Sequence, residues 1–306
     1  MAAKPSKSTA SLPRALQLAR IALRPQNRGP VFAAVVIVAT IVGLMLAWNR
    51  WGAPSAAGPD YVVTPEKIEL TRQPEWIHAD VKAEVVRASS LSRLNLGDRR
   101  LVAQVAQAFA LHPWIAKVTR VEKRFPAKVI VVVEYRRPVA AVELAREGNR
   151  ELLFVDAEGV LLPSLDFAGN QAADYLRIAG IASTPASVYG SPWGDEAVAG
   201  AARIAAAWGG RFKQAGLYRI LPSESASGEI TFELRTLGDT RVVWGTAPGR
   251  ESTAEPTAEQ KIAALLAYIT DKGPLDRPGG EHLLDLRKLA GQSPPRTAAN
   301  SSETPR

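Results

Sequence analysis

The 18 residues from Val31 to Trp48, VFAAVVIVATIVGLMLAW, contain no charged side chain. As an α-helix they would rise about 27 Å, close to the ~30 Å hydrocarbon core of a bilayer. Trp48 and Trp51 lie at the end of this stretch, where an aromatic belt is expected at the membrane interface. We therefore expect one transmembrane helix over residues 31–48, so that any folded domain lies on one side of it.

The distribution of charge around the span predicts its orientation. Positive side chains are concentrated before it, at Arg14, Arg20, Arg24 and Arg28, and only Arg50 follows closely. The positive-inside rule then places residues 1–30 in the cytoplasm, as a basic tail or an amphipathic helix on the inner leaflet, and residues 52–306 outside. A cleaved signal peptide ending near 55–57 is the alternative, but its apolar core would be long. The expected location is the inner membrane, single-pass.

The overall charge excludes some classes of function. The chain carries a net charge of +8, but seven of its 38 basic residues precede the first acidic residue, Asp60. The remaining 31 basic and 30 acidic residues nearly balance, which argues against a nucleic-acid-binding face. The chain has no cysteine, which excludes disulfides, cysteine metal sites and thiol catalysis.

After a Gly/Pro-rich linker over residues 49–60, periodicity predicts a strand, two helices and two strands. These are strand 67–70, helix 78–88, a helix from Asp98 as N-cap to Leu111, and strands 118–123 and 129–133. The turn between the last two strands, Phe125-Pro126-Ala127, uses a proline that presets the backbone. The order β-α-α-β-β over residues 61–139 resembles a POTRA domain.

Three local motifs narrow this resemblance. They are His112-Pro113-Trp114-Ile115-Ala116-Lys117-Val118, then Arg124-Phe125-Pro126, then Val133-Glu134-Tyr135-Arg136-Arg137-Pro138-Val139-Ala140. In this order, after a single anchor, they are similar to the signature of the FtsQ/DivIB family of bacterial cell-division proteins. The resemblance implies an α+β chain with one transmembrane helix, a POTRA domain, and a mixed β-rich domain with two helices over residues 140–290.

The second domain resembles the family more loosely. The expected elements are strands on either side of an Asp-x-x-Gly turn over 151–160, a strand 175–180, a helix 195–214, a hairpin of 229–234 and 240–244, a helix 257–270, and a last strand 282–288. This last strand is similar to the family's terminal strand. Residues 291–306 are rich in Pro, Ser, Thr and Ala and are expected to be disordered.

No catalytic constellation is found in the sequence. His78, His112 and His282 lie in three separate elements without metal-ligand spacing, so we interpret them as surface or cap residues. Asp156 and Glu158 fit an Asp-x-x-Gly turn better than an acid/base pair. We predict no enzymatic activity, no catalytic residues, no cofactor and no metal.

What remains is a binding function. The resemblance implies that the terminal strand holds FtsB- and FtsL-type bitopic partners, with Leu283, Leu284, Asp285, Leu286, Arg287 and Lys288 as partner-binding residues. Lys288 replaces a frequent aromatic of the family. If the strand lies at a sheet edge, its backbone groups can accept a partner strand, and charged substitutions at Leu284 and Leu286 should abolish binding. An ordinary covered core strand is the alternative.

Val121 and Lys123 fall in a region that the family links to recruitment. The chain is therefore expected to be a non-enzymatic scaffold at the division septum. Two other classes stay open: a POTRA-bearing secretion or assembly chaperone, and a membrane-tethered cell-wall enzyme.

Overall fold

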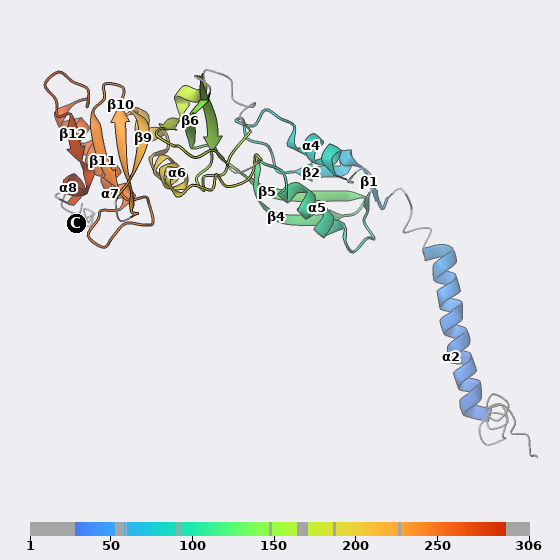
Figure 1. Cartoon of the computed structure of the whole chain (residues 1–306). Helices are drawn as coiled ribbons and strands as arrows, with labels where there is room; N and C mark the ends of the chain where they lie inside the picture. The colour runs from blue at the N-terminus through green and yellow to red at the C-terminus, as the bar shows by residue number, and fades with distance from the viewer. Residues whose placement is uncertain are drawn as a thin grey trace, which may run out of the picture.

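The computed structural model describes residues 28–52, 58, 60–89, 91, 94–146, 149–163, 171–185, 188–225 and 228–291. The basic tail before residue 28, half of the predicted linker (residues 53–57 and 59) and the tail after residue 291 lie outside these residues. The described part is a mixed α+β structure with one apolar N-terminal helix and a large sheet, which confirms the coarse fold class (Figure 1).

The N-terminal helix α2 (Arg28–Ala47) continues into a π-helical turn, η2 (Trp48–Gly52), so the helical segment is longer at both ends than predicted. Its stretch Phe32–Arg50 is long and apolar enough to cross a membrane, and none of it is buried against the rest of the chain. A helix whose apolar side chains are exposed all round requires an apolar environment. Length and composition are therefore those of a membrane span.

The first globular unit contains a three-stranded sheet in the order β2-β5-β4. Its elements are β1 (Val62–Val63), η3 (Pro65–Lys67), β2 (Ile68–Leu70), α4 (Val81–Ala88), β3 (Leu94–Asn95), α5 (Leu101–Ala110), β4 (Ile115–Arg124) and β5 (Lys128–Tyr135). Strand β2 is parallel to β5 and β4 is antiparallel to it. A parallel pair needs a crossover, which the two helices provide.

The alternation of β5 explains its central place. Val129, Val131 and Val133 are buried, whereas the intervening residues are half-buried. The three valines share one hydrophobic cluster with the apolar faces of α4 and α5, which include Val85 and Phe109. The hairpin predicted from this pattern is confirmed and is longer than expected.

Two predicted helix starts were wrong in this unit. Helix α4 begins at Val81, because the Asp80 side chain accepts a hydrogen bond from the Ala83 amide (3.0 Å) and so caps the helix. Asp98 does not cap α5. Its carboxylate accepts from the Arg100 amide (2.8 Å) in a local turn, and the helix starts at Leu101. The small pairing of β1 with β3 was not predicted.

The second unit is built on a seven-stranded sheet in the order β12-β11-β10-β9-β8-β6-β7. Its elements are β6 (Ala140–Arg146), β7 (Asn149–Val155), η5 (Gln171–Asp174), β8 (Leu176–Ile178), α6 (Glu196–Trp208), η6 (Gly209–Lys213), β9 (Leu217–Glu224), β10 (Ile230–Thr236), β11 (Arg241–Gly245), α7 (Ala258–Lys272), β12 (Leu283–Asp285) and α8 (Leu286–Gly291). Helices α6 and α7 supply the crossovers for the parallel pairs β8·β9 and β11·β12.

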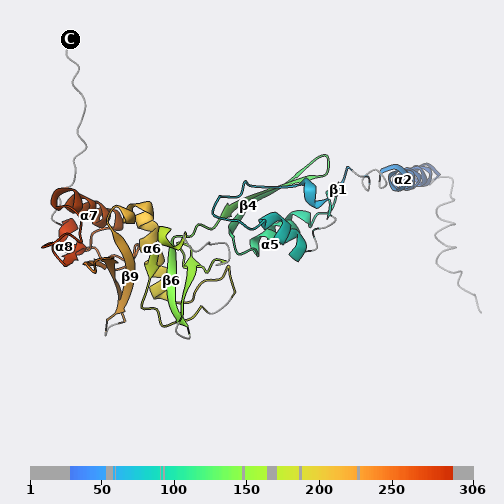
Figure 2. The same cartoon turned by 90° about the horizontal axis from the view of Figure 1, so that it is seen from above.

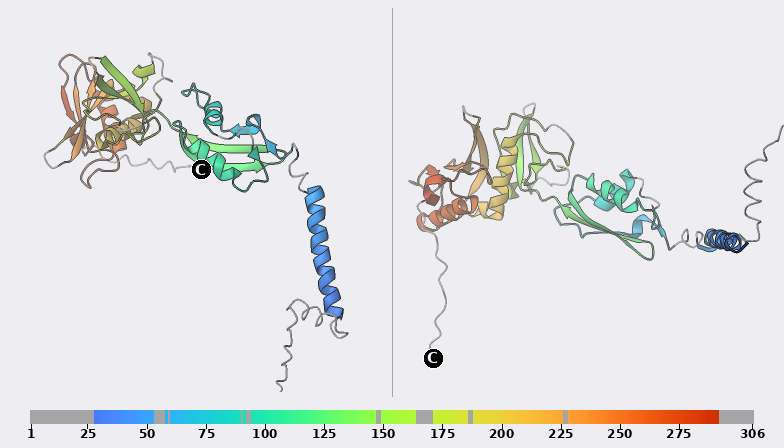
Figure 3. Two further views of the ribbon diagram at one scale, coloured as in Figure 1. Left: turned by 45° about the vertical axis from the view of Figure 1, so that its right-hand side comes forward. Right: turned by 90° about the horizontal axis from the view of Figure 1, so that it is seen from below.

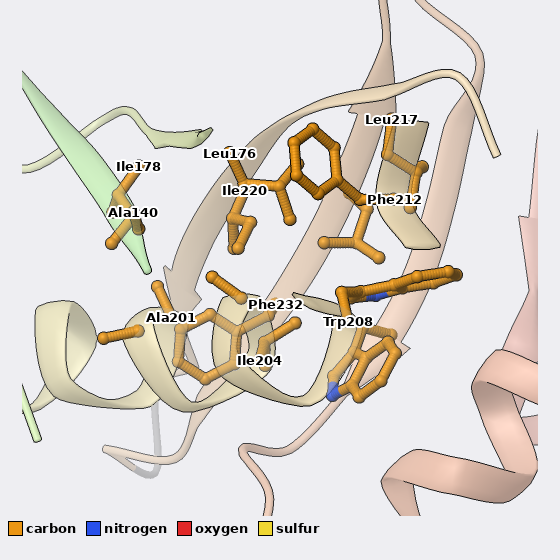
Figure 4. Packing of buried hydrophobic residues seen from close by; sticks show 14 of the residues in the cluster. Ala140, Leu176, Ile178, Ala201, Ile204, Trp208, Phe212, Leu217, Ile220 and Phe232 are labelled. Atoms are coloured by element: carbon orange, nitrogen blue, oxygen red, sulfur yellow. The ribbon is translucent and has the colours of Figure 1, made fainter. Parts of the chain in front are cut away.

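A single core holds this sheet to its helices. Figure 4 shows α6 lying across the strands, with Ile204 next to Phe232 of the sheet, in a core that also contains Trp208 and Ile220. The Trp208 and Trp244 rings lie 6.2 Å apart between centroids. Gly200 of α6 is required here, because a Cβ atom at this position would lie 2.5 Å from the Phe232 ring.

Several predictions for the second unit need correction. No strand was predicted over β6 or β9. Val160, predicted as a strand residue, makes only an isolated bridge with Pro192. The helix over 195–214 ends at Trp208, where Gly209 adopts a φ of 52°, and continues as the 3-10 turn η6. The last strand ends at Asp285, and residues 286–291 form a helix.

The two units are joined by a buried junction. The Arg136 guanidinium lies 2.6 Å from the carboxylate of Asp156, a residue that is only 2% exposed. The backbone carbonyl of Arg136 accepts a hydrogen bond from the Trp76 indole (3.1 Å). Phe154 of β7 belongs to the core of the first unit. Both views of Figure 3 show the two sheets in separate bodies that follow one another along the chain.

Candidate functional site

The candidate docking site is the outer edge of β12. The strand ends the seven-stranded sheet, and no described strand pairs with its outer side (Figure 1). On its inner side β12 pairs in parallel with β11, with Arg241 opposite Leu283 and Val243 opposite Asp285. The docking prediction depended on an edge position, and β12 has one within the described residues. An unpaired row of backbone groups at a sheet edge is a template for an added strand.

The register identifies the backbone groups that face outward. The Arg241 amide donates to the His282 carbonyl (2.9 Å), which turns residues 282 and 284 toward β11. Backbone direction alternates along a strand, so the N–H and C=O groups of Leu283 and the N–H of Asp285 point away from β11, whereas the Asp285 carbonyl begins α8. These are the groups that an incoming strand would pair with.

The predicted partner-binding residues divide into two classes. Leu284 (5% exposed) and Leu286 (0%) are in the core of the second unit, whereas Leu283 is 57% exposed. Arg287 and Lys288 are exposed on α8. Charged substitutions at Leu284 and Leu286 therefore test folding, not docking. The sequence suggested that strand pairing would continue through residue 288, but the structure limits it to three residues.

Asp285 sets this limit. Its carboxylate accepts from the Arg287 amide (3.1 Å) and from the Arg287 guanidinium (2.9 and 2.8 Å), so it ends the strand and starts α8. The hydrogen bond from the Arg287 side chain is the main reason that the pKa of Asp285 lies below its ordinary value. Asp285 is therefore a positioning residue of this edge, held charged by Arg287.

The predicted recruitment residues lie in β4, in the first unit. Val121 is opposite Val131 and packs against the core of that unit. The Lys123 ammonium group donates to the carbonyl oxygens of Leu96 (2.9 Å) and Asp98. Both side chains are thus engaged within the unit, and neither belongs to the β12 edge. Their role in recruitment stays a prediction.

The residues considered for chemistry have structural roles. The Asp156 carboxylate accepts from the Glu158 and Val160 amides (3.0 and 2.9 Å) and pairs with Arg136, which confirms the turn interpretation. His112 is not a surface residue, because it is only 9% exposed. Its Nε2 atom lies 3.0 Å from the carboxylate of Glu84. Among the described residues, no group of three or more His, Cys, Asp or Glu side chains is arranged to hold a metal ion.

A cleft of about 620 Å³ lies at the junction of the two units. Its lining includes Trp76, Arg137, Tyr175, Phe212 and Lys213. The Arg137 guanidinium lies 5.9 Å from the Trp76 ring centroid, and Lys213 is paired with Asp174 (2.5 Å). The Lys213–Asp174 pair offsets one of these positive charges, and nothing in the structure identifies an occupant.

Comparison with models of known protein families gives no match, and comparison with curated protein sequences gives none either. The likeness to the FtsQ/DivIB family therefore rests on the motifs quoted above. The geometry of the β12 edge is independent of that likeness.

Proposed function

We propose that this chain is a membrane-anchored scaffold of the bacterial division machinery, without enzymatic activity of its own. In this proposal α2 spans the inner membrane, the first unit is a POTRA domain, and β12 docks FtsB- and FtsL-type partners outside the cytoplasm. The observation that carries the docking role is Leu283, whose side chain is exposed and whose backbone groups face outward at a sheet edge. Main-chain pairing at such an edge is a general mode of peptide recognition.

Two further observations support the proposal. The first unit has its two helices between β2 and the β4–β5 hairpin, with β2 parallel to β5, as expected for a β-α-α-β-β domain. Helix α2 has the length and composition of a single span. The enzyme alternative depended on Asp156 and Glu158 as an acid/base pair. The Asp156 carboxylate instead pairs with Arg136 and accepts a hydrogen bond from the Val160 amide of its own turn.

Replacing Leu283 by proline is expected to weaken binding of the FtsB/FtsL-type partners at least about tenfold while leaving the fold intact. Proline removes an outward N–H that the β11 ladder does not use, and its ring obstructs an added strand. Partner affinity is measured by titration of the purified whole chain. Leu283→Ala, which keeps the N–H, is the control and should lose less. Unchanged affinity of a folded Leu283→Pro chain would refute docking at β12.

A fluorescent protein fused to the N-terminus is expected to mark a ring at the division site of dividing cells. Deletion of residues 60–140 should disperse the ring if the first unit recruits the chain, whereas Leu283→Pro should leave the ring and lose only the partners. The distribution is read by microscopy across the cell cycle. Uniform membrane fluorescence of the unaltered chain would contradict the division role.

A further inference from the structure

The tip of the β4–β5 hairpin exposes a large apolar side chain. Phe125 is 68% exposed at the turn between the strands, and Arg124 and Lys128 flank the turn. The neighbouring Ala127, in contrast, is fully buried. Leu111 of the same unit is also exposed (78%), so exposure alone does not distinguish Phe125. What distinguishes it is its place at a hairpin tip between two cations.

The chain itself places this tip near the membrane. The Phe125 ring packs edge-on against Tyr61, with 5.7 Å between ring centroids, and Tyr61 directly precedes β1. Figure 2 shows the rounded end of the hairpin beside β1, on the side where the chain leaves α2. The nine residues from Ala53 to Tyr61 span at most about 30 Å. The tip is thus tethered within reach of the surface that α2 would enter.

The charge of the hairpin suits an anionic surface. Lys117, Arg120, Lys123, Arg124 and Lys128 lie on it. Three carboxylates offset them. Glu122 pairs with Arg120 (3.0 Å) and Arg124 (3.1 Å), and Glu69 pairs with Lys128 (2.5 Å). Glu134 lies opposite Lys117 at the other end of the hairpin. The Lys123 ammonium group is bound to backbone carbonyls, which leave its charge uncompensated. The hairpin with Glu69 keeps a net charge of about +2, with an apolar side chain at its end.

We propose that the hairpin tip rests on the outer surface of the membrane, with Phe125 among the headgroups of anionic phospholipids and the flanking cations beside the phosphates. Aromatic and basic side chains together are favoured at this interface. The proposal rests on the membrane anchoring included in the proposed function, but not on the division role or on the β12 edge. Its partner is the bilayer and not another protein.

The absence of cysteine allows a direct test. A Phe125→Cys chain is labelled with an environment-sensitive fluorophore and reconstituted whole into vesicles of phosphatidylglycerol and phosphatidylcholine. We expect blue-shifted emission and at least twofold quenching by lipids with a nitroxide headgroup. The matched control is Leu237→Cys, an equally exposed residue (79%) in the turn between β10 and β11. Its label should emit as in water and remain unquenched.

Failure of this inference is distinguishable from failure of the anchor. Resistance of the reconstituted chain to alkaline extraction measures whether α2 is inserted. If the chain resists extraction but the label at 125 behaves like that at 237, the tip does not touch the membrane. If the chain is extracted, the anchor is refuted as well. Equal quenching in vesicles of phosphatidylcholine alone would overturn the assignment to anionic lipid, and Arg124→Gln should reduce quenching only in the anionic vesicles.

Discussion

Replacement of Glu255 by alanine is expected to lower the free energy of unfolding of the second unit by about 3–5 kcal/mol. The Lys261 ammonium group is completely buried, 2.6 Å from the Glu255 carboxylate and 4.9 Å from the Trp244 ring centroid. Glu255 also accepts from the amide (2.9 Å) and hydroxyl (2.6 Å) of Thr246. Removal of the carboxylate leaves a buried cation without its counter-charge.

The measurement is urea unfolding of the whole chain in detergent, followed by tryptophan fluorescence. Glu259→Ala is a matched control at the start of α7, the helix that carries Lys261, because Glu259 forms an exposed pair with Arg211 and should contribute less than about 1 kcal/mol. Adding Lys261→Met to Glu255→Ala should recover part of the loss, since the uncompensated charge disappears. Equal losses for Glu255→Ala and Glu259→Ala would contradict the buried-pair interpretation.

The same pair predicts a dependence on pH. Burial alone would raise the pKa of Glu255, but the hydrogen bonds from Lys261 and Thr246 together lower it below the ordinary value of 4.5. A carboxyl group whose pKa is lower in the folded state stabilises the fold above its unfolded pKa. The difference between the unaltered chain and Glu255→Ala should therefore be complete at pH 7 and shrink as the pH falls below about 4.5.

Leu284→Asp is expected to unfold the C-terminal end of the second sheet, with a loss of about 4 kcal/mol or more. The change removes a buried apolar side chain, at about 2–5 kcal/mol, and places a carboxylate in its position. Leu284 is 5% exposed and belongs to the core beneath α7 and α8. Hydrogen exchange of β11 and α8 in the whole chain measures the local loss.

Leu283→Asp is the control for this prediction, because the neighbouring side chain is 57% exposed. It should change the free energy of unfolding by less than about 0.5 kcal/mol. Similar hydrogen exchange in the two variants would contradict the division of the strand into a buried and an exposed class. Together the variants separate what the strand does for folding from what it offers to a partner.

The elements that sequence reasoning found have strong local signals. The alternating valines of β5 required one covered face, and Thr257 with Gln260 forms the capping box that starts α7. Strand β9 contains Pro222, and proline has no amide hydrogen to donate to a neighbouring strand, so its presence argues against a strand in the middle of a sheet. The structure tolerates Pro222 because β8 pairs with β9 only at Arg219 and Ile220, so Pro222 lies beyond the end of β8.

The sequence pointed to the terminal strand as the candidate site, but it did not show where the strand ends or which of its side chains are exposed. Residues 282–288 were chosen for their likeness to the terminal strand of the FtsQ/DivIB family, and that likeness did not indicate where the strand ends. The end depends on Asp285 turning its side chain back to the Arg287 amide, a local bond that competes with strand pairing. The Arg136–Asp156 junction was beyond prediction, since its partners are distant in the sequence and the pair depends on tertiary packing.

The junction between the two units has a mechanical consequence. Arg136 and Asp156 close it from within, and Gly190 lets the second unit approach Pro113, where a Cβ atom would lie 2.9 Å from the proline Cα. A tight contact of this kind fixes the distance between the two units, which a flexible linker would leave variable. If the chain is anchored by α2, β12 stays at a fixed distance from the first unit, and the linker of at most about 30 Å limits how far above the bilayer both can lie. Only a partner whose own stalk reaches that range can engage β12.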